Sequence, residues 1–120
     1  MEKILEKELE ELGVELDEVM ERFIGDEDLY FECMEQFVQD PAFGKLGESL
    51  GIRDYEEAFS QAHSLKGVSG NLGLTKMYQA VCEIVEPLRK KEYDNIEQNY
   101  VLVMQQLESV RSVVGLYKRL

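Results

Sequence analysis

Apolar residues recur along this chain at spacings of three and four, which is the pattern of a helix with one buried face. Residues 1–12 follow this pattern, and so does a second short segment from Val14 to Ile24. A glycine follows each segment, Gly13 or Gly25, as is common where a helix ends. Nowhere do β-branched residues alternate with polar ones over the length of a strand, so the pattern predicts helices throughout.

Capping residues and helix breakers divide the rest of the chain into further helices. We expect these helices over residues 26–40, 41–50, 54–72, 75–91 and 94–115. Asp26, Asp54, Thr75 and Asp94 stand where N-caps are needed. Pro87 should kink the helix over residues 75–91 or shorten it.

Long helices joined by short connections pack antiparallel, so the expected fold is all-α. The sequence predicts an antiparallel up-down four-helix bundle with additional N-terminal helices. The bundle is expected to consist of residues 26–40, 54–72, 75–91 and 94–115, with residues 1–25 as a helical extension over one end or side. A chain of 120 residues has the size of one domain, so we expect a single domain, 1–120, with its core in residues 26–115.

The charge of the chain limits its partners. Lys and Arg number 13 against 25 Asp and Glu, and the net charge of −12 repels nucleic acid and anionic membrane surfaces. No apolar run approaches the ~20 residues of a membrane span, and the N-terminus lacks the apolar stretch of a signal peptide. Cys33 and Cys82 match no metal or redox spacing, so we expect two reduced thiols, no metal site and a cytoplasmic protein.

The helix expected over residues 54–72 carries the only histidine, His63. At ~100° per residue, one side of this helix collects small and medium-sized residues that should face the bundle: Ala58, Ala62, Leu65, Ser69 and Leu72. His63 lies on a different side, together with Phe59, Lys66, Gly67 and Gly70. We therefore expect the imidazole to project into solvent near the middle of a rigid helix.

The glycines on the histidine side are costly for the helix, since each mid-helix glycine costs about 0.8–1 kcal/mol relative to alanine. Gly67 and Gly70 face away from the expected bundle, so core packing does not explain them. Missing side chains there would let the backbone of another protein approach His63. Lys66, one turn from His63, could offset the charge of a phosphorylated imidazole. Phe59, one turn before His63, either offers apolar docking surface or packs against a neighbouring helix.

The segment His63-x-Leu65-Lys66-Gly67-x-x-x-x-Leu72-Gly73 resembles the signature of histidine-containing phosphotransfer (HPt) domains of bacterial and fungal phosphorelays. The resemblance covers roughly residues 26–115. No kinase ATP-binding motif or receiver domain accompanies the segment. The chain therefore looks like a freestanding HPt protein of two-component signalling, which shuttles a phosphoryl group between receiver-domain aspartates.

The resemblance implies a phosphoryl carrier and not an enzyme. A receiver domain with an aspartyl phosphate would dock over the His63 face, and Nε2 of His63 would attack phosphorus in line. Lys66 would stabilise the phosphate, while Gly67 and Gly70 would give clearance to the docked partner, with Phe59 as docking surface. The chain would need no cofactor, because the receiver would contribute Mg²⁺. Its partners would be response-regulator receiver domains, with a hybrid histidine kinase as a candidate donor, and the shuttle would be a monomer.

One position departs from the family pattern. Where related domains offer a polar residue about twenty positions after the histidine, this chain has Val85 and Glu86. If Glu86 does not reach the ring, water or a polar residue of the same helix is left to orient the imidazole: Gln61, Ser60 or Glu56.

Other functions compete for the same residues. The domain could accept phosphate directly from a chemotaxis-type kinase, since Ala62-His63-Ser64-Leu65-Lys66-Gly67 suits that branch too. It could also be a helical adaptor that binds receiver domains without carrying phosphate. A di-metal carboxylate enzyme is disfavoured, because it needs Glu-x-x-His pairs and Ser60 stands three residues before the single histidine.

Overall fold

The structure is a computed structural model that describes residues 1–120, and it contains seven α-helices and no strand. The helices are α1 (Lys3–Glu11), α2 (Leu16–Arg22), α3 (Glu27–Val38), α4 (Ala42–Gly51), α5 (Tyr55–Asn71), α6 (Thr75–Arg89) and α7 (Ile96–Arg119). The all-α fold predicted from the apolar spacing is confirmed.

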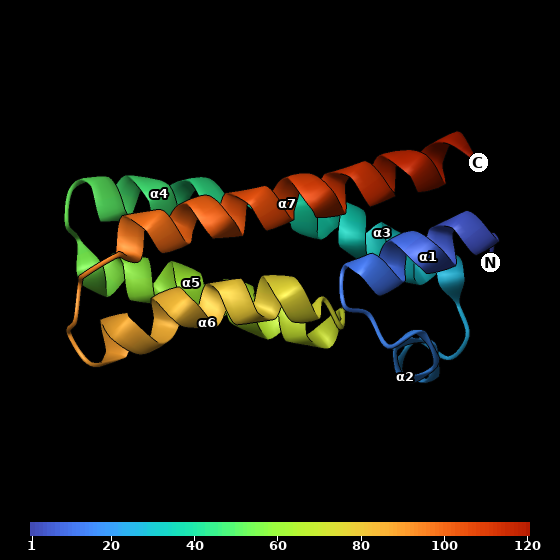
Figure 1. The fold of residues 1–120 in the computed structure, drawn as a ribbon, viewed down its shortest axis with the longest axis horizontal. Coiled ribbons are helices and arrows are strands. Elements are labelled where there is room, and N and C mark those ends of the chain that lie inside the picture. The colour runs from blue at the N-terminus through green and yellow to red at the C-terminus, as the bar shows by residue number, and fades with distance from the viewer.

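Helices α4 to α7 form a bundle in one part of the molecule (Figure 1). Helix α5 packs against α4 and α6, and α6 packs against α5 and α7. Helix α7, with 24 residues the longest, continues beyond the bundle and packs against α3 and α1. The molecule is elongated, 43 × 24 × 19 Å, and both termini lie at the end formed by α1 and α3 (Figure 1). An up-down helical bundle with additional N-terminal helices is therefore what the chain forms.

The fourth helix of the bundle, beside α5, differs from the one predicted from the sequence. Residues 26–40 were expected there, but α4 is the helix that packs along α5. Tyr100, near the start of α7, donates a hydrogen bond to the carbonyl of Phe43 in α4 at 2.8 Å. Lys118, near the end of α7, pairs with Glu35 in α3 at 2.7 Å. Helices α4 and α3 therefore follow one another along α7. Apolar periodicity identifies the buried face of a helix but not the helix that covers it.

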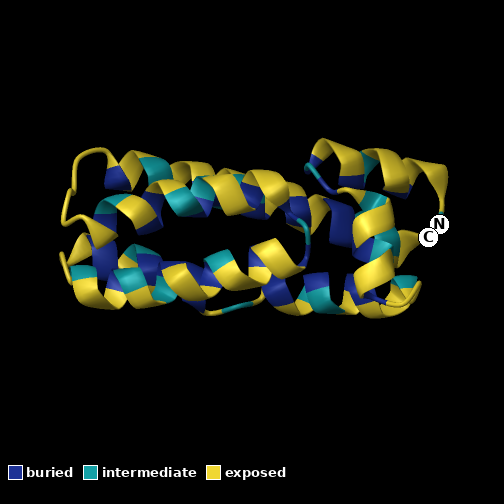
Figure 2. Cartoon of the chain, turned by 90° about the horizontal axis from the view of Figure 1, so that it is seen from below, coloured by how far each residue is buried: buried dark blue, intermediate teal, exposed yellow.

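One hydrophobic core runs through both parts of the molecule, from Leu5 in α1 to Val114 in α7. Figure 2 shows buried segments on the inward sides of the helices along the whole length. The predicted bundle face of α5 is confirmed, since each of its residues is at most 1% exposed: Ala58, Ala62, Leu65, Ser69 and Leu72. The Ser69 hydroxyl donates to the carbonyl of Leu65 at 2.8 Å, so this polar group is satisfied inside the core.

Two of the four predicted N-caps are present. The carboxylate of Asp26 accepts a hydrogen bond from the backbone N–H of Leu29 at 3.0 Å. The carboxylate of Asp54 accepts one from the backbone N–H of Glu57 at 3.2 Å, which fixes the start of the histidine-bearing helix α5.

The other two caps were wrong. Thr75 is already the first residue of α6, and the Leu74 before it offers no capping side chain. Helix α7 begins only at Ile96, after Asn95 in the left-handed conformation, so Asp94 lies outside it. Pro87 has the expected shortening effect, because α6 ends two residues later.

Gly73 fixes the end of α5. Its φ is +69°, and a Cβ at this position would lie 2.5 Å from Cγ2 of Val19 in α2. Any other residue would meet both left-handed strain and overlap with Val19. The glycine therefore lets α2 pack directly on the turn between α5 and α6.

Candidate functional site

His63 lies near the middle of α5, on the side turned away from the bundle, and it is exposed as predicted. Its ring stacks on the ring of Phe59 one turn earlier, with ring centres 5.7 Å apart and an interplanar angle of 29°. Phe59 is half-buried and packs against the hydrophobic core. One face of the imidazole thus rests on a fixed aromatic ring, while the residue stays open to solvent.

Neither Glu86 nor Gln61, two of the residues considered for orienting the imidazole, contacts it. Val85 is buried in the core. Glu86 pairs with two cations and makes no hydrogen bond to His63. The side-chain amide of Gln61 donates to Glu57 at 2.7 Å. The contact of the imidazole that the structure shows is its stacking on Phe59.

Two cations near the histidine share one carboxylate, that of Glu86. Nζ of Lys66 lies 3.8 Å from Oε1 of Glu86. Nε of Arg89 lies 3.6 Å from Oε2 of the same carboxylate. The Arg89 guanidinium also lies over the Phe59 ring, with Cζ 5.3 Å from the ring centre. Glu86 therefore links the cation on α5 to the cation on α6, next to His63.

Gly67 and Gly70 have different surroundings. Nothing lies within 4 Å of the place that a Cβ on Gly67 would take. A Cβ on Gly70 would meet the ring of Tyr78 in α6 at 3.4 Å. Packing against α6 thus contributes to the choice of glycine at Gly70 but not at Gly67. The clearing beside the histidine is centred on Gly67.

A shallow depression of about 450 Å³ opens beside the histidine. Its lining residues are Arg22, His63, Lys66, Gly67, Gly70, Asn71 and Tyr78. Two of these residues are cations, although the whole chain carries a net charge of −12. Both cations are paired with carboxylates, Lys66 with Glu86 and Arg22 with Glu18, so an anionic group that enters the depression would compete with these carboxylates for them.

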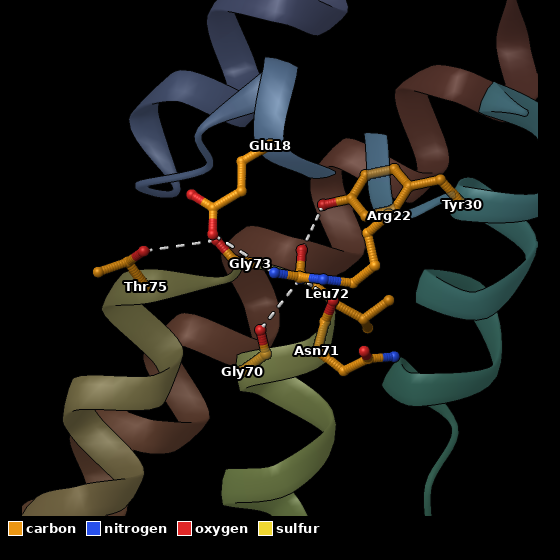
Figure 3. A network of polar contacts seen from close by, with 8 residues as sticks. All are labelled: Glu18, Arg22, Tyr30, Gly70, Asn71, Leu72, Gly73 and Thr75. Atoms are coloured by element: carbon orange, nitrogen blue, oxygen red, sulfur yellow. Dashed lines mark hydrogen bonds and ion pairs between the residues drawn. The ribbon is translucent and has the colours of Figure 1, made fainter. Parts of the chain in front are cut away.

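Arg22, from α2, is one of the residues that line this depression. Figure 3 shows its side chain at the end of α5. Its Nη1 donates to the carbonyl oxygen of Asn71 and, at 3.5 Å, to that of Gly70. Its Nη2 lies 3.4 Å from Oε1 of Glu18. The last carbonyls of a helix have no partner inside the helix and form the negative end of its dipole, so a cation there stabilises the end of α5.

Tyr30 closes the same helix end from α3 (Figure 3). Its buried hydroxyl donates to the carbonyl of Leu72 at 2.7 Å. Burial raises the pKa of Tyr30, so the hydroxyl remains a hydrogen-bond donor well above neutral pH. Arg22 and Tyr30 together tie the end of the histidine-bearing helix to the N-terminal helices.

Sequence reasoning missed Arg22, Tyr30 and Arg89. The first two contact carbonyls of the histidine-bearing helix that lie 48 and 42 positions away in the chain, and no local pattern encodes such contacts. Arg89 had a signal, because it follows Glu86 by three residues and this offset places both side chains on one side of a helix.

Metal binding, the two cysteines and membrane insertion were the other possibilities considered from the sequence. No three His, Cys, Asp or Glu side chains lie together in an arrangement that could hold a metal ion. Cys33 and Cys82 are both free and half-buried. None of the helices has the length and apolar character needed to cross a membrane.

An exposed histidine that lines a depression together with a lysine, on a helical bundle, is an arrangement suited to phosphoryl transfer. The family model of the Hpt domain matches residues 4–112, which is most of the chain and includes the whole candidate site. The chain therefore belongs to the Hpt domain family, a family of histidine phosphotransfer domains that act in phosphorelays with receiver domains. The match begins within α1, ahead of the residues that carry the resemblance in the sequence. No curated protein and no solved structure matches the chain.

Proposed function

We propose that this chain carries a phosphoryl group on His63 between the aspartates of two receiver domains. One observation carries the proposal: in a chain of the Hpt family, the only histidine is exposed beside the open side of Gly67 and lines one depression together with Lys66. A solvent-facing nucleophile with nearby cations suits a carrier that meets its phosphate donor in a docked complex.

The proposed transfer is an in-line exchange at phosphorus. Nε2 of neutral His63 gives its electron pair to phosphorus while the bond from phosphorus to the donor aspartate oxygen breaks, and that oxygen leaves as a carboxylate. The ring keeps its proton on Nδ1. The reverse exchange with the aspartate of a second receiver breaks the N–P bond and restores the neutral imidazole.

The chain contributes positioning and positive charge to this exchange. Lys66 lines the depression with His63, and Arg89 lies over the Phe59 ring on which the imidazole stacks. In this proposal both cations approach the oxygens of the phosphoryl group. In this proposal the chain has no cofactor of its own. The Mg²⁺ belongs to the receiver, where it neutralises charge on the transferring group.

The open side of Gly67 supports docking of a protein partner. Because no atom lies within 4 Å of the missing Cβ, the backbone of a receiver can approach α5 directly beside His63. Phe59 offers apolar surface one turn away on the same side. The cations Arg22, Lys66 and Arg89 are complementary to the acidic surroundings of a phosphorylated aspartate.

Incubation of the chain with a purified receiver domain, phosphorylated by acetyl phosphate in Mg²⁺, tests the proposal. We expect a label that is labile in acid, stable in base and located by mass spectrometry on His63. The variant His63→Gln should take no label yet keep its circular dichroism spectrum and its binding to the receiver. A labelled His63→Gln protein would contradict the assignment.

The same experiment separates the competing functions. A substrate of a chemotaxis-type kinase would take label from the catalytic domain of such a kinase and not from the receiver. A helical adaptor would bind the receiver and take no label on any residue.

A further inference from the structure

Glu86 occupies an unexpected position for an acidic residue, because it stands in a site that has to hold a phosphoryl dianion. Its carboxylate lies 3.8 Å from Nζ of Lys66 and 3.6 Å from Nε of Arg89. Lys66, which lines the depression with His63, and Arg89, which lies over the neighbouring Phe59 ring, are therefore both paired with a negative charge before any phosphoryl group arrives.

Glu86 lowers the positive charge that the site offers to a phosphoryl group. With a neutral His63, the two cations and one carboxylate leave one positive charge. The phosphoryl group carries about two negative charges near neutral pH, and a ring that keeps its Nδ1 proton carries one positive charge, so the phosphorylated site has a net charge of about zero. With a neutral side chain at position 86, the phosphorylated site would keep one positive charge.

Fold stability does not account for this cluster. The Glu86 side chain is about half exposed, 48%, and the Arg89 side chain is similarly exposed, 51%. Exposed ion pairs of this length add little to the free energy of unfolding, since solvent screens them. Lys66 also carries its charge on a flexible stem whose donors rotate freely. An exchange of partners between a carboxylate and a phosphoryl group on His63 is therefore energetically easy.

We propose that Glu86 competes with the phosphoryl group on His63 for Lys66 and Arg89, and thereby keeps the phosphohistidine from becoming too stable to pass its phosphate on. The inference rests on the proposed carrier function. A shuttle needs nearly balanced transfer in both directions, and a carboxylate beside the phosphate weakens the phosphorylated state relative to the free one. Glu86 is a positioning residue, because it acts through the two cations.

The test compares two variants that remove one negative charge each. Glu86→Gln removes the carboxylate from the site, whereas Glu83→Gln removes an exposed carboxylate one turn earlier on the same helix, where it forms no ion pair. The probe is a purified receiver domain phosphorylated by acetyl phosphate in Mg²⁺. The measured quantity is the ratio of phosphohistidine to aspartyl phosphate at equilibrium, together with the lifetime of isolated phosphohistidine followed by ³¹P NMR.

We expect Glu86→Gln to shift the equilibrium toward phosphohistidine by about three- to tenfold, the effect of one partly screened charge at short range. Glu83→Gln should leave the ratio as in the parent chain. The shift should shrink as salt concentration rises and should be much smaller when Lys66→Ala is combined with Glu86→Gln.

Three results would overturn the inference. They are equal ratios for Glu86→Gln and Glu83→Gln, a shift toward aspartyl phosphate, and a shift that persists undiminished in the Lys66→Ala background. Circular dichroism melts of each variant exclude an effect of folding. If the parent chain takes no label on His63, the carrier function itself fails, and this result differs from a labelled chain that is indifferent to Glu86.

Discussion

The two faces of α5 both contain very small residues, but for different reasons. On the bundle face Ala58 and Ala62 are fully buried where α4 and α6 pack against the helix. On the outer face, Gly67 has nothing within 4 Å of its missing Cβ. Packing inside the molecule explains the alanines. No contact inside the molecule requires glycine at position 67, and in the proposed function the open side of Gly67 admits a docking receiver.

Substitutions on the bundle face of α5 should lower the stability of the fold. Leu65→Ala removes a fully buried side chain and leaves a cavity between the helices of the bundle, so we expect a loss of about 2–5 kcal/mol in the free energy of unfolding. Urea denaturation measures this loss. The transfer rate per folded molecule should stay unchanged, and a specific loss of transfer without loss of stability would break the distinction between the faces.

Substitutions on the outer face of α5 should lower the rate of phosphoryl transfer. Gly67→Leu places a bulky side chain in the clearing, so phosphoryl transfer from a receiver should fall about 100-fold, as expected when reacting groups cannot approach correctly. Rapid-quench kinetics measure the rate. Labelling of His63 by the small donor phosphoramidate should continue, since no protein has to dock.

A matched control exists for this substitution. Gly44 is also an exposed helical glycine with nothing within 4 Å of its missing Cβ, but it lies in α4. Gly44→Leu should leave transfer unchanged. Equal transfer rates for the Gly67→Leu and Gly44→Leu proteins would refute the role of the clearing.

Substitution of Lys66 should slow phosphoryl transfer less than substitution of Gly67. Lys66→Ala removes one charge-assisted contact to the phosphoryl group, so we expect transfer to slow by roughly tenfold with little change in melting temperature. Lys45→Ala, an exposed lysine of α4, is the control. Equal transfer rates in the Lys66→Ala and Lys45→Ala proteins would show that Lys66 has no specific role in transfer.

The smallest expected effect is on the free energy of unfolding, when alanine replaces glycine at two different positions. Gly67→Ala should raise the free energy of unfolding by about 0.5–1 kcal/mol, because alanine favours the helix and the space is open. Gly47→Ala should lower it, because the new Cβ would lie 2.5 Å from the hydroxyl oxygen of Tyr100. Thermal denaturation gives both signs, and a destabilised Gly67→Ala protein would show that Gly67 is structurally required after all.

Local features of the chain were predictable, and contacts between distant segments were not. The faces of α5 and the caps at Asp26 and Asp54 follow from spacing and side-chain chemistry within a few residues. The choice of α4 over α3 as the neighbour of α5 depends on how several apolar faces share one core, which spacing along one helix does not encode. The contact of Arg22 with the end of α5 depends on that tertiary arrangement as well.

The anchoring of the last turn of α5 determines how the histidine-bearing helix opens. Helix ends ordinarily fray, and their amide hydrogens exchange with solvent at low cost. Here the carbonyls of Asn71 and Leu72 are held by Arg22 from α2 and Tyr30 from α3, so fraying requires these helices to detach first. Amides in the last turn of α5 should therefore exchange as slowly as those in its middle. We expect the surface around His63 and the N-terminal helices to open as a single cooperative unit, and in the proposed function each docking receiver meets the same rigid surface.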